Sequence, residues 1–113
     1  RLELEHLAEH GIPLEVCPTS NIATRVVERI EEHPIRAMRD AGVVVTVNSD
    51  DPAYFGGYLN QNFAQTFEAL PALGAREAYT LARNSFEASF AKAEDKARWI
   101  AELDAHFAQA AAA

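Results

Sequence analysis

Cysteine is almost absent from this sequence, since Cys17 is the only one in 113 residues. A lone thiol cannot form an internal disulfide, which excludes a disulfide-stabilised secreted scaffold and favours a reducing, cytoplasmic setting. Long apolar runs are missing too: none approaches the ~20 residues of a membrane-spanning helix, and the start of the chain does not resemble a signal peptide. We therefore expect no membrane partner.

Positive charge is also scarce. Ten lysine and arginine residues stand against 17 aspartate and glutamate residues, for a formal net charge of −7. An excess of negative charge disfavours contact with phosphate backbones and with anionic lipid surfaces. The sequence therefore argues against nucleic acid and against membrane surfaces as partners.

The chain does contain an alternation of helical and strand patterns, in a length typical of one domain and with 49% hydrophobic residues. Periodicity and breaker residues predict strands over 12–17 and 43–48, and helices or helical turns over 1–10, 24–31, 34–41, 60–70, 75–85 and 91–108. This order implies a parallel sheet, but two strands are too few to be stable alone or to cover the last three helices. We expect residues 1–108 to be a segment of a larger α/β domain, with a disordered alanine-rich tail over 109–113.

Both predicted strands end in polar residues, in LEVCPTSN and in VVTVNSDDP. In α/β folds ligands bind at the carboxyl ends of the strands, and in a (β/α)8 barrel catalytic groups project from several strand ends. Successive strand residues point to opposite faces, so Asp50 and Asp51 should serve different neighbours, one a metal ion and the other a substrate atom. The alternative is local: Asp51-Pro52 starts a turn and Asp50 caps a helix.

Several motifs together resemble one family. LEVCPTSN, an HP pair twelve residues beyond Asn21, AGVVVTVNSDDPAYFGGY and ARNSFEASF are similar, from about Leu2 to Phe107, to the C-terminal part of the adenosine/adenine deaminase family of the amidohydrolase superfamily. Within it, DPAYFGGYLNQNF is more similar to the adenine deaminase branch. The resemblance implies a zinc-dependent (β/α)8 TIM barrel in which this chain supplies the seventh and eighth strands, and which is incomplete without its N-terminal part.

The resemblance also implies roles for the acidic pair. Asp50 matches the aspartate that ligates the single zinc ion and contacts its bound water, and Asp51 matches the carboxylate that hydrogen-bonds the purine at N7. Asn48 and Ser49 are supporting candidates only. The remaining zinc ligands of the family are histidines from earlier strands, and its proton-donating glutamate is also outside this sequence. The segment alone should therefore be inactive.

The expected function of the parent protein is hydrolytic deamination of a 6-aminopurine, adenine to hypoxanthine plus ammonia. Adenosine, or a related nucleoside such as aminodeoxyfutalosine, is the alternative substrate. Two other classes compete with this hypothesis. A phosphoacceptor receiver domain has this length but needs five strands and a lysine after the fifth, and a non-catalytic fragment or structural remnant would need no site at all.

Other reactive side chains have simpler explanations. Cys17 has no partner for a Cys-x-x-Cys zinc site and is interpreted as a small buried residue. The aromatic residues of the segment after the acidic pair could line a base pocket or pack on the barrel rim; these are Tyr54, Phe55 and Tyr58. The histidines are expected on charged helix faces or, before Pro34, in a local structural role; they are His6, His10, His106 and His33.

Overall fold

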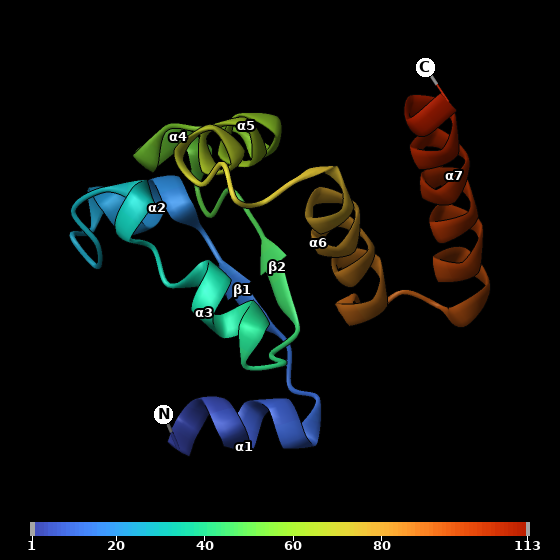
Figure 1. The fold of residues 1–113 in the computed structure, drawn as a ribbon, viewed down its shortest axis with the longest axis horizontal. Helices are drawn as coiled ribbons and strands as arrows, with labels where there is room; N and C mark the ends of the chain where they lie inside the picture. The colour runs from blue at the N-terminus through green and yellow to red at the C-terminus, as the bar shows by residue number, and fades with distance from the viewer. Residues whose placement is uncertain (1, 113) are drawn as a thin grey trace.

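A computed structural model describes residues 2–112 of the chain (Figure 1). It contains two short strands, seven α-helices and one 3-10 helix in that range. In chain order these are α1 (Leu2–His10), β1 (Leu14–Val16), α2 (Pro18–Ala23), η1 (Ile30–Glu32), α3 (Ile35–Asp40), β2 (Val45–Val47), α4 (Pro52–Phe55), α5 (Leu59–Ala69), α6 (Ala75–Ala88) and α7 (Ala93–Ala112).

The two strands form a parallel pair, as the alternation of elements predicts. Leu14 lies opposite Val45 and Val16 opposite Val47. The Leu14 N–H donates to the Val44 carbonyl at 2.8 Å, at the start of the paired segment. Residues in register share a face of a parallel sheet, so the valines of both strands lie on one face. The connection through α2, η1 and α3 is the crossover that parallel strands require.

One face of the strand pair is packed against helices and forms the core. Val45 and Val47 are each 1% exposed, because β-branched side chains fill this pleated surface well. The core cluster draws on both strands, on α3, on the loop between α3 and β2 and on the segments that follow β2; it comprises Val16, Ile35, Val43, Val45, Val47, Leu73 and Leu81. Burying such side chains contributes roughly 1.5–3 kcal/mol each, so this cluster fixes the positions of the strand ends.

The helices are distributed around the strands so that one end of the sheet collects several of them. α2, α4 and α5 gather beyond the carboxyl ends of β1 and β2, and α1 lies at the opposite end (Figure 1). α6 stands beside β2, and α7 is the outermost element, packed on α6 (Figure 1). The loops and helices that follow both strands therefore meet at one edge.

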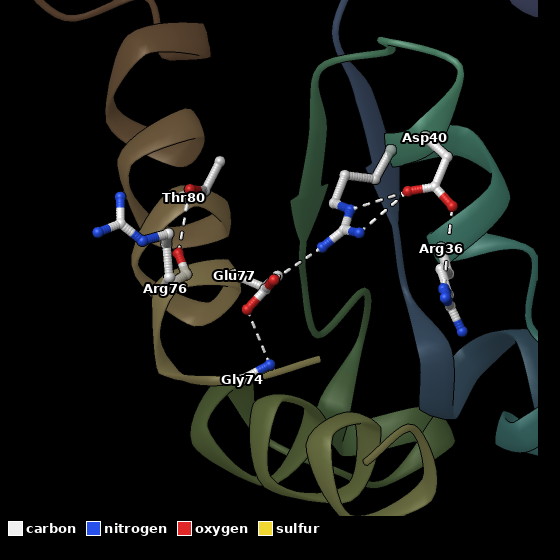
Figure 2. Close-up of polar contacts among 7 residues, drawn as sticks. Arg36, Asp40, Gly74, Arg76, Glu77 and Thr80 are labelled. Atoms are coloured by element: carbon white, nitrogen blue, oxygen red, sulfur yellow. Dashed lines mark hydrogen bonds and ion pairs between the residues drawn. The ribbon is translucent and has the colours of Figure 1, made fainter. Parts of the chain in front are cut away.

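An ionic network joins α3 to α6. Arg39 Nη1 lies 3.1 Å from Glu77 Oε1, while Glu77 Oε2 accepts the Gly74 N–H at 2.8 Å at the start of α6. Figure 2 shows the Glu77 carboxylate between these two donors. The Gly74 N–H is the largest cause of the lowered pKa of Glu77, and Arg39 adds to it. This network links the helix before β2 to a helix after it.

Most of the predicted elements are present, and both strands are shorter than predicted. The helical turn predicted over 24–31 is not formed: residues 24–29 are turns and bends, with Arg25 at φ of 61°, and only the 3-10 helix η1 follows. Pro18–Ala23 and Pro52–Phe55 are short helices, α2 and α4, where the polar residues and prolines predict turns. Pro34 is the cap of α3, which begins one residue later. α7 continues through Ala112, so the alanine-rich stretch expected to be disordered is helical, because alanine is the best helix former. Arg1 and Ala113 lie outside the described residues. No helix between residues 2 and 112 is long and apolar enough to cross a membrane.

Candidate functional site at the strand ends

A side-chain hydrogen bond joins the segments that follow the two strands, beyond the backbone bond from the Asn48 N–H to the Val16 carbonyl. Ser20, on α2 directly after β1, donates its hydroxyl to Asp50 Oδ2 at 2.7 Å. Ser20 is 3% exposed, whereas the Asp50 residue is exposed. Asp50 also has φ of 56°, a left-handed conformation that is uncommon for residues other than glycine but more accessible to aspartate and asparagine. The chain thus turns sharply at Asp50, and the Ser20 hydroxyl fixes the orientation of the Asp50 carboxylate.

Asp51 contacts a different neighbour from Asp50, as predicted, although both residues lie beyond the end of β2 and the left-handed turn at Asp50, not strand alternation, separates them. Its carboxylate accepts the Tyr54 N–H at 3.2 Å and caps the short helix α4. The local alternative is therefore seen in part, with Asp51 rather than Asp50 as the capping residue. The Asp51 residue is exposed like Asp50, so both carboxylates remain accessible to a ligand.

A polar hollow of about 480 Å³ opens beside Asp50. Its lining comes from both strand ends and from the start of α5: Glu15, Cys17, Asn48, Ser49, Asp50 and Leu59. Glu15 lies opposite Thr46 in the strand register, on the face away from the helix-packed core. Asn48, one of the supporting candidates, donates Nδ2 to Thr46 Oγ1 at 2.8 Å. The hollow thus presents two carboxylates and an amide at the carboxyl edge of the sheet.

The Cys17 thiol in this hollow is not activated. Desolvation by its partial burial raises the pKa of Cys17, and the Asp50 and Glu15 carboxylates raise it further. A thiol with a raised pKa stays protonated at neutral pH and is a poor nucleophile. The structure therefore agrees with the interpretation of Cys17 as a packing residue, although it is half-buried rather than fully buried.

Asn62 on α5 is a buried residue whose role the sequence does not reveal. It is 0% exposed, and its Oδ1 accepts the Thr19 N–H at 3.0 Å while its Nδ2 donates to the carbonyls of Gly57 and Tyr58 at 2.8 and 3.1 Å. It therefore fastens the start of α2 to the loop that follows α4. LNQNF offers three amide side chains, and helical periodicity alone does not single out this one.

The loop at Gly57 packs against α2 so closely that a side chain is excluded. Gly57 has φ of +77°, and a Cβ there would lie 2.8 Å from Thr19 Oγ1. Tyr54 and Tyr58 on either side of this loop are 80% and 69% exposed, and neither lines the hollow beside Asp50. In the described part of the chain, Tyr54, Phe55 and Tyr58 are therefore absent from the lining of the polar hollow.

Three of the four histidines are exposed on helices, as predicted, whereas His33 contacts a residue 12 positions earlier in the chain. His6, His10 and His106 are exposed. His33 is 7% exposed, has Nε2 2.9 Å from Asn21 Oδ1, and has its pKa lowered by desolvation. Between residues 2 and 112 no three His, Cys, Asp or Glu side chains are grouped closely enough to hold a metal ion. Any metal bound at Asp50 would need ligands from elsewhere.

Parallel strands with a polar hollow at their carboxyl edge place the chain in the class of α/β proteins that bind ligands at strand ends. Within that class the family is clear, because the adenosine deaminase family model matches residues 2–106. The chain belongs to the adenosine deaminase family.

The most similar relatives include enzymes with two substrate names. An adenine deaminase of Trichlorobacter lovleyi is 59% identical over 103 residues, covering 91% of this chain and 30% of the relative. An aminodeoxyfutalosine deaminase of Streptomyces avermitilis is 56% identical over 105 residues, covering 93% and 29%. The chain therefore spans about 30% of the length of the relatives it matches.

Solved structures agree on the fold. An adenine deaminase from Arthrobacter aurescens superposes with a TM-score of 0.85 at 42% identity, covering 89% of this chain and 31% of that one. Arabidopsis ADAL complexed with IMP gives a TM-score of 0.81 at 28% identity, covering 91% and 30%. The predicted family and the predicted incomplete (β/α)8 barrel are both confirmed.

Proposed function

We propose that the intact protein containing this chain hydrolyses adenine to hypoxanthine and ammonia. The observation that carries the proposal is the Asp50 carboxylate, held by Ser20 beside a polar hollow at the carboxyl edge of the strands. The names of the relatives favour adenine as the 6-aminopurine. In the balanced reaction, water adds its oxygen to C6 of the purine, ring N1 gains a proton, and the amino group leaves as ammonia.

Asp50 fits the role of a metal ligand. A carboxylate oxygen is a suitable donor for zinc, and the Asp50 residue is exposed with one oxygen engaged by Ser20. Zinc sites in enzymes use three protein ligands, so the other two or more would come from the rest of the barrel. When bound, zinc would supply an acidic water at neutral pH. The segment alone, with one ligand, would be inactive.

Asp51 is proposed to hold the purine by its N7 edge. It follows Asp50 directly but points to the start of α4, which separates a substrate contact from the metal contact. Glu15 and Asn48 complete the polar lining near Asp50. The lone cysteine fits a reducing, cytoplasmic compartment for this enzyme.

Substitution of Asp51 separates its helix-capping contact from the proposed substrate contact. In the intact enzyme we expect Asp51→Ala to lower kcat/KM for adenine about 10- to 150-fold, the range for losing a charge-assisted hydrogen bond. Asp51→Ser is the matched control, because serine caps helices well but is too short to reach a base. We expect Asp51→Ser to restore the melting temperature and not the turnover. If serine restored turnover as well, Asp51 would act only through α4.

Steady-state kinetics on three substrates tests the proposed function. We expect the intact protein to turn over adenine with a higher kcat/KM than adenosine or aminodeoxyfutalosine, as followed by ammonia release. Aminodeoxyfutalosine is the second candidate, because the Streptomyces avermitilis relative named for it is 56% identical to this chain. Preference for either nucleoside would assign the protein to that substrate, and absence of turnover on all three would favour a non-catalytic remnant.

A further inference from the structure

Ser20 is a buried hydroxyl placed where it can act only on Asp50. Its side chain comes from α2, after β1, and donates across to the end of β2 over 2.7 Å. At 3% exposure it is shielded from water, so its hydroxyl cannot exchange this bond for solvent without opening the fold. Among residues 2–112 it is also the only side chain that donates to the Asp50 carboxylate.

The position of Ser20 is fixed independently of Asp50. The Thr19 N–H, one residue before Ser20, donates to Oδ1 of Asn62 at 3.0 Å. The Thr24 backbone N–H donates to the Ser20 carbonyl at 2.8 Å, at the end of α2, and this bond does not depend on the Thr24 side chain. A hydroxyl on a segment held from both sides can impose a rotamer on its acceptor, which a mobile side chain cannot do.

Asp50, by contrast, needs such a partner. Its φ of 56° places it in the left-handed region, and its side chain is otherwise accessible to solvent. A carboxylate in this setting has several rotamers, and either oxygen could face the hollow. The bond from Ser20 engages Oδ2 and leaves Oδ1 for another ligand.

We propose that Ser20 is a positioning residue that holds Oδ2 of Asp50 and thereby presents Oδ1 to the metal ion. The inference rests on the proposed function, because it assumes that Asp50 ligates the metal. Groups that orient a ligating side chain in this way typically affect metal affinity or activity 10- to 100-fold when removed. Because Ser20 contacts Asp50 and not the purine, its effect should fall on metal affinity and kcat rather than on KM.

The test compares Ser20→Ala with Thr24→Ala in the intact enzyme. Alanine suits a helix and leaves no void of consequence, so we expect both variants to fold with melting temperatures near that of the unsubstituted protein. We expect Ser20→Ala to weaken zinc binding about 10- to 100-fold in chelator competition and to lower kcat at saturating zinc, with KM for adenine little changed. Thr24→Ala removes a hydroxyl at the C-cap of the same helix, keeps the backbone bond to the Ser20 carbonyl and does not touch Asp50, so it should leave both quantities unchanged. Ser20→Thr, which keeps the hydroxyl, should retain most of the zinc affinity.

Asp50→Ala in the same assays separates the two hypotheses. If Asp50→Ala loses zinc while Ser20→Ala binds zinc and turns over adenine normally, the role of Ser20 is wrong and the proposed function stands. If Asp50→Ala retains zinc and activity, the proposed site itself is wrong. Equal loss of zinc affinity in Ser20→Ala and Thr24→Ala would indicate a general effect on α2 and would also overturn the inference.

Discussion

Replacing Asp50 by alanine in the intact enzyme should abolish zinc retention and reduce kcat/KM for adenine by more than about 100-fold, which is the upper end for a group outside the metal shell. The reason is geometric. Asp50 follows β2 by three residues, and because the valines of β2 are almost fully buried, the carboxylate is held at a fixed position beside the hollow. No neighbouring acid in the described range is equivalently held, since Asp51 caps α4. Metal analysis after gel filtration and steady-state kinetics are the measurements.

Asp40→Ala is the matched control for the Asp50 experiment. Asp40 is also an exposed acid at the end of an element, but it pairs with Arg36 and Arg39 on α3 and takes no part in the hollow. Exposed ion pairs contribute little to stability, so this variant should keep both zinc and turnover. Retention of stoichiometric zinc by Asp50→Ala would show that the metal, if any, is bound elsewhere.

Replacing Asn62 by leucine should cause a larger loss of stability than substitution of Ser20, Asp50 or Asp51, because Asn62 is fully buried and pairs several backbone groups. Leucine has a similar volume but would leave the Thr19 N–H and the Gly57 carbonyl without the amide that pairs them. Each buried polar group left unpaired costs about 1–3 kcal/mol, so the free energy of unfolding of the intact protein should fall by about 2–6 kcal/mol. Denaturant unfolding monitored by circular dichroism measures this.

Asn60→Leu on the same helix provides the comparison. Asn60 is exposed, so the same chemical change there should alter the free energy of unfolding by about 0.5 kcal/mol or less. Because Asn62 also fixes α2, Asn62→Leu should weaken zinc binding in the fraction that remains folded. Equal stability of the two variants would mean that the amide of Asn62 contributes nothing beyond its volume.

How much of the site can be predicted from the sequence depends on how far apart in the chain the contacting residues are. The position of Asp50 and Asp51 at a strand end is a local property, since the valine run and the polar residues after it are contiguous. Their different partners agree with the prediction, but the cause is the left-handed turn at Asp50 rather than alternation along a strand, since β2 already ends at Val47. The position of the acidic pair could be predicted because it depends on a few neighbouring residues.

Ser20 and Asn62 could not be predicted in the same way. The Ser20–Asp50 bond joins residues 30 apart, and the Asn62–Thr19 bond joins residues 43 apart. Serine and asparagine are common in turns and caps, so their presence in CPTSN and LNQNF indicates local structure as readily as a long-range contact. For the same reason the sequence does not predict α2, a polar six-residue helix that these contacts hold in place.

The two-stranded sheet has a practical consequence for handling this segment. β1 and β2 pair only with each other in residues 2–112, so each has one lateral border without a neighbouring strand. Asn84 Nδ2 shields one point of the β2 border by donating to the Val45 carbonyl at 2.9 Å. Exposed strand edges of this kind pair with other chains, so the segment expressed by itself should aggregate. In the intact protein, closure of the barrel pairs both edges with neighbouring strands.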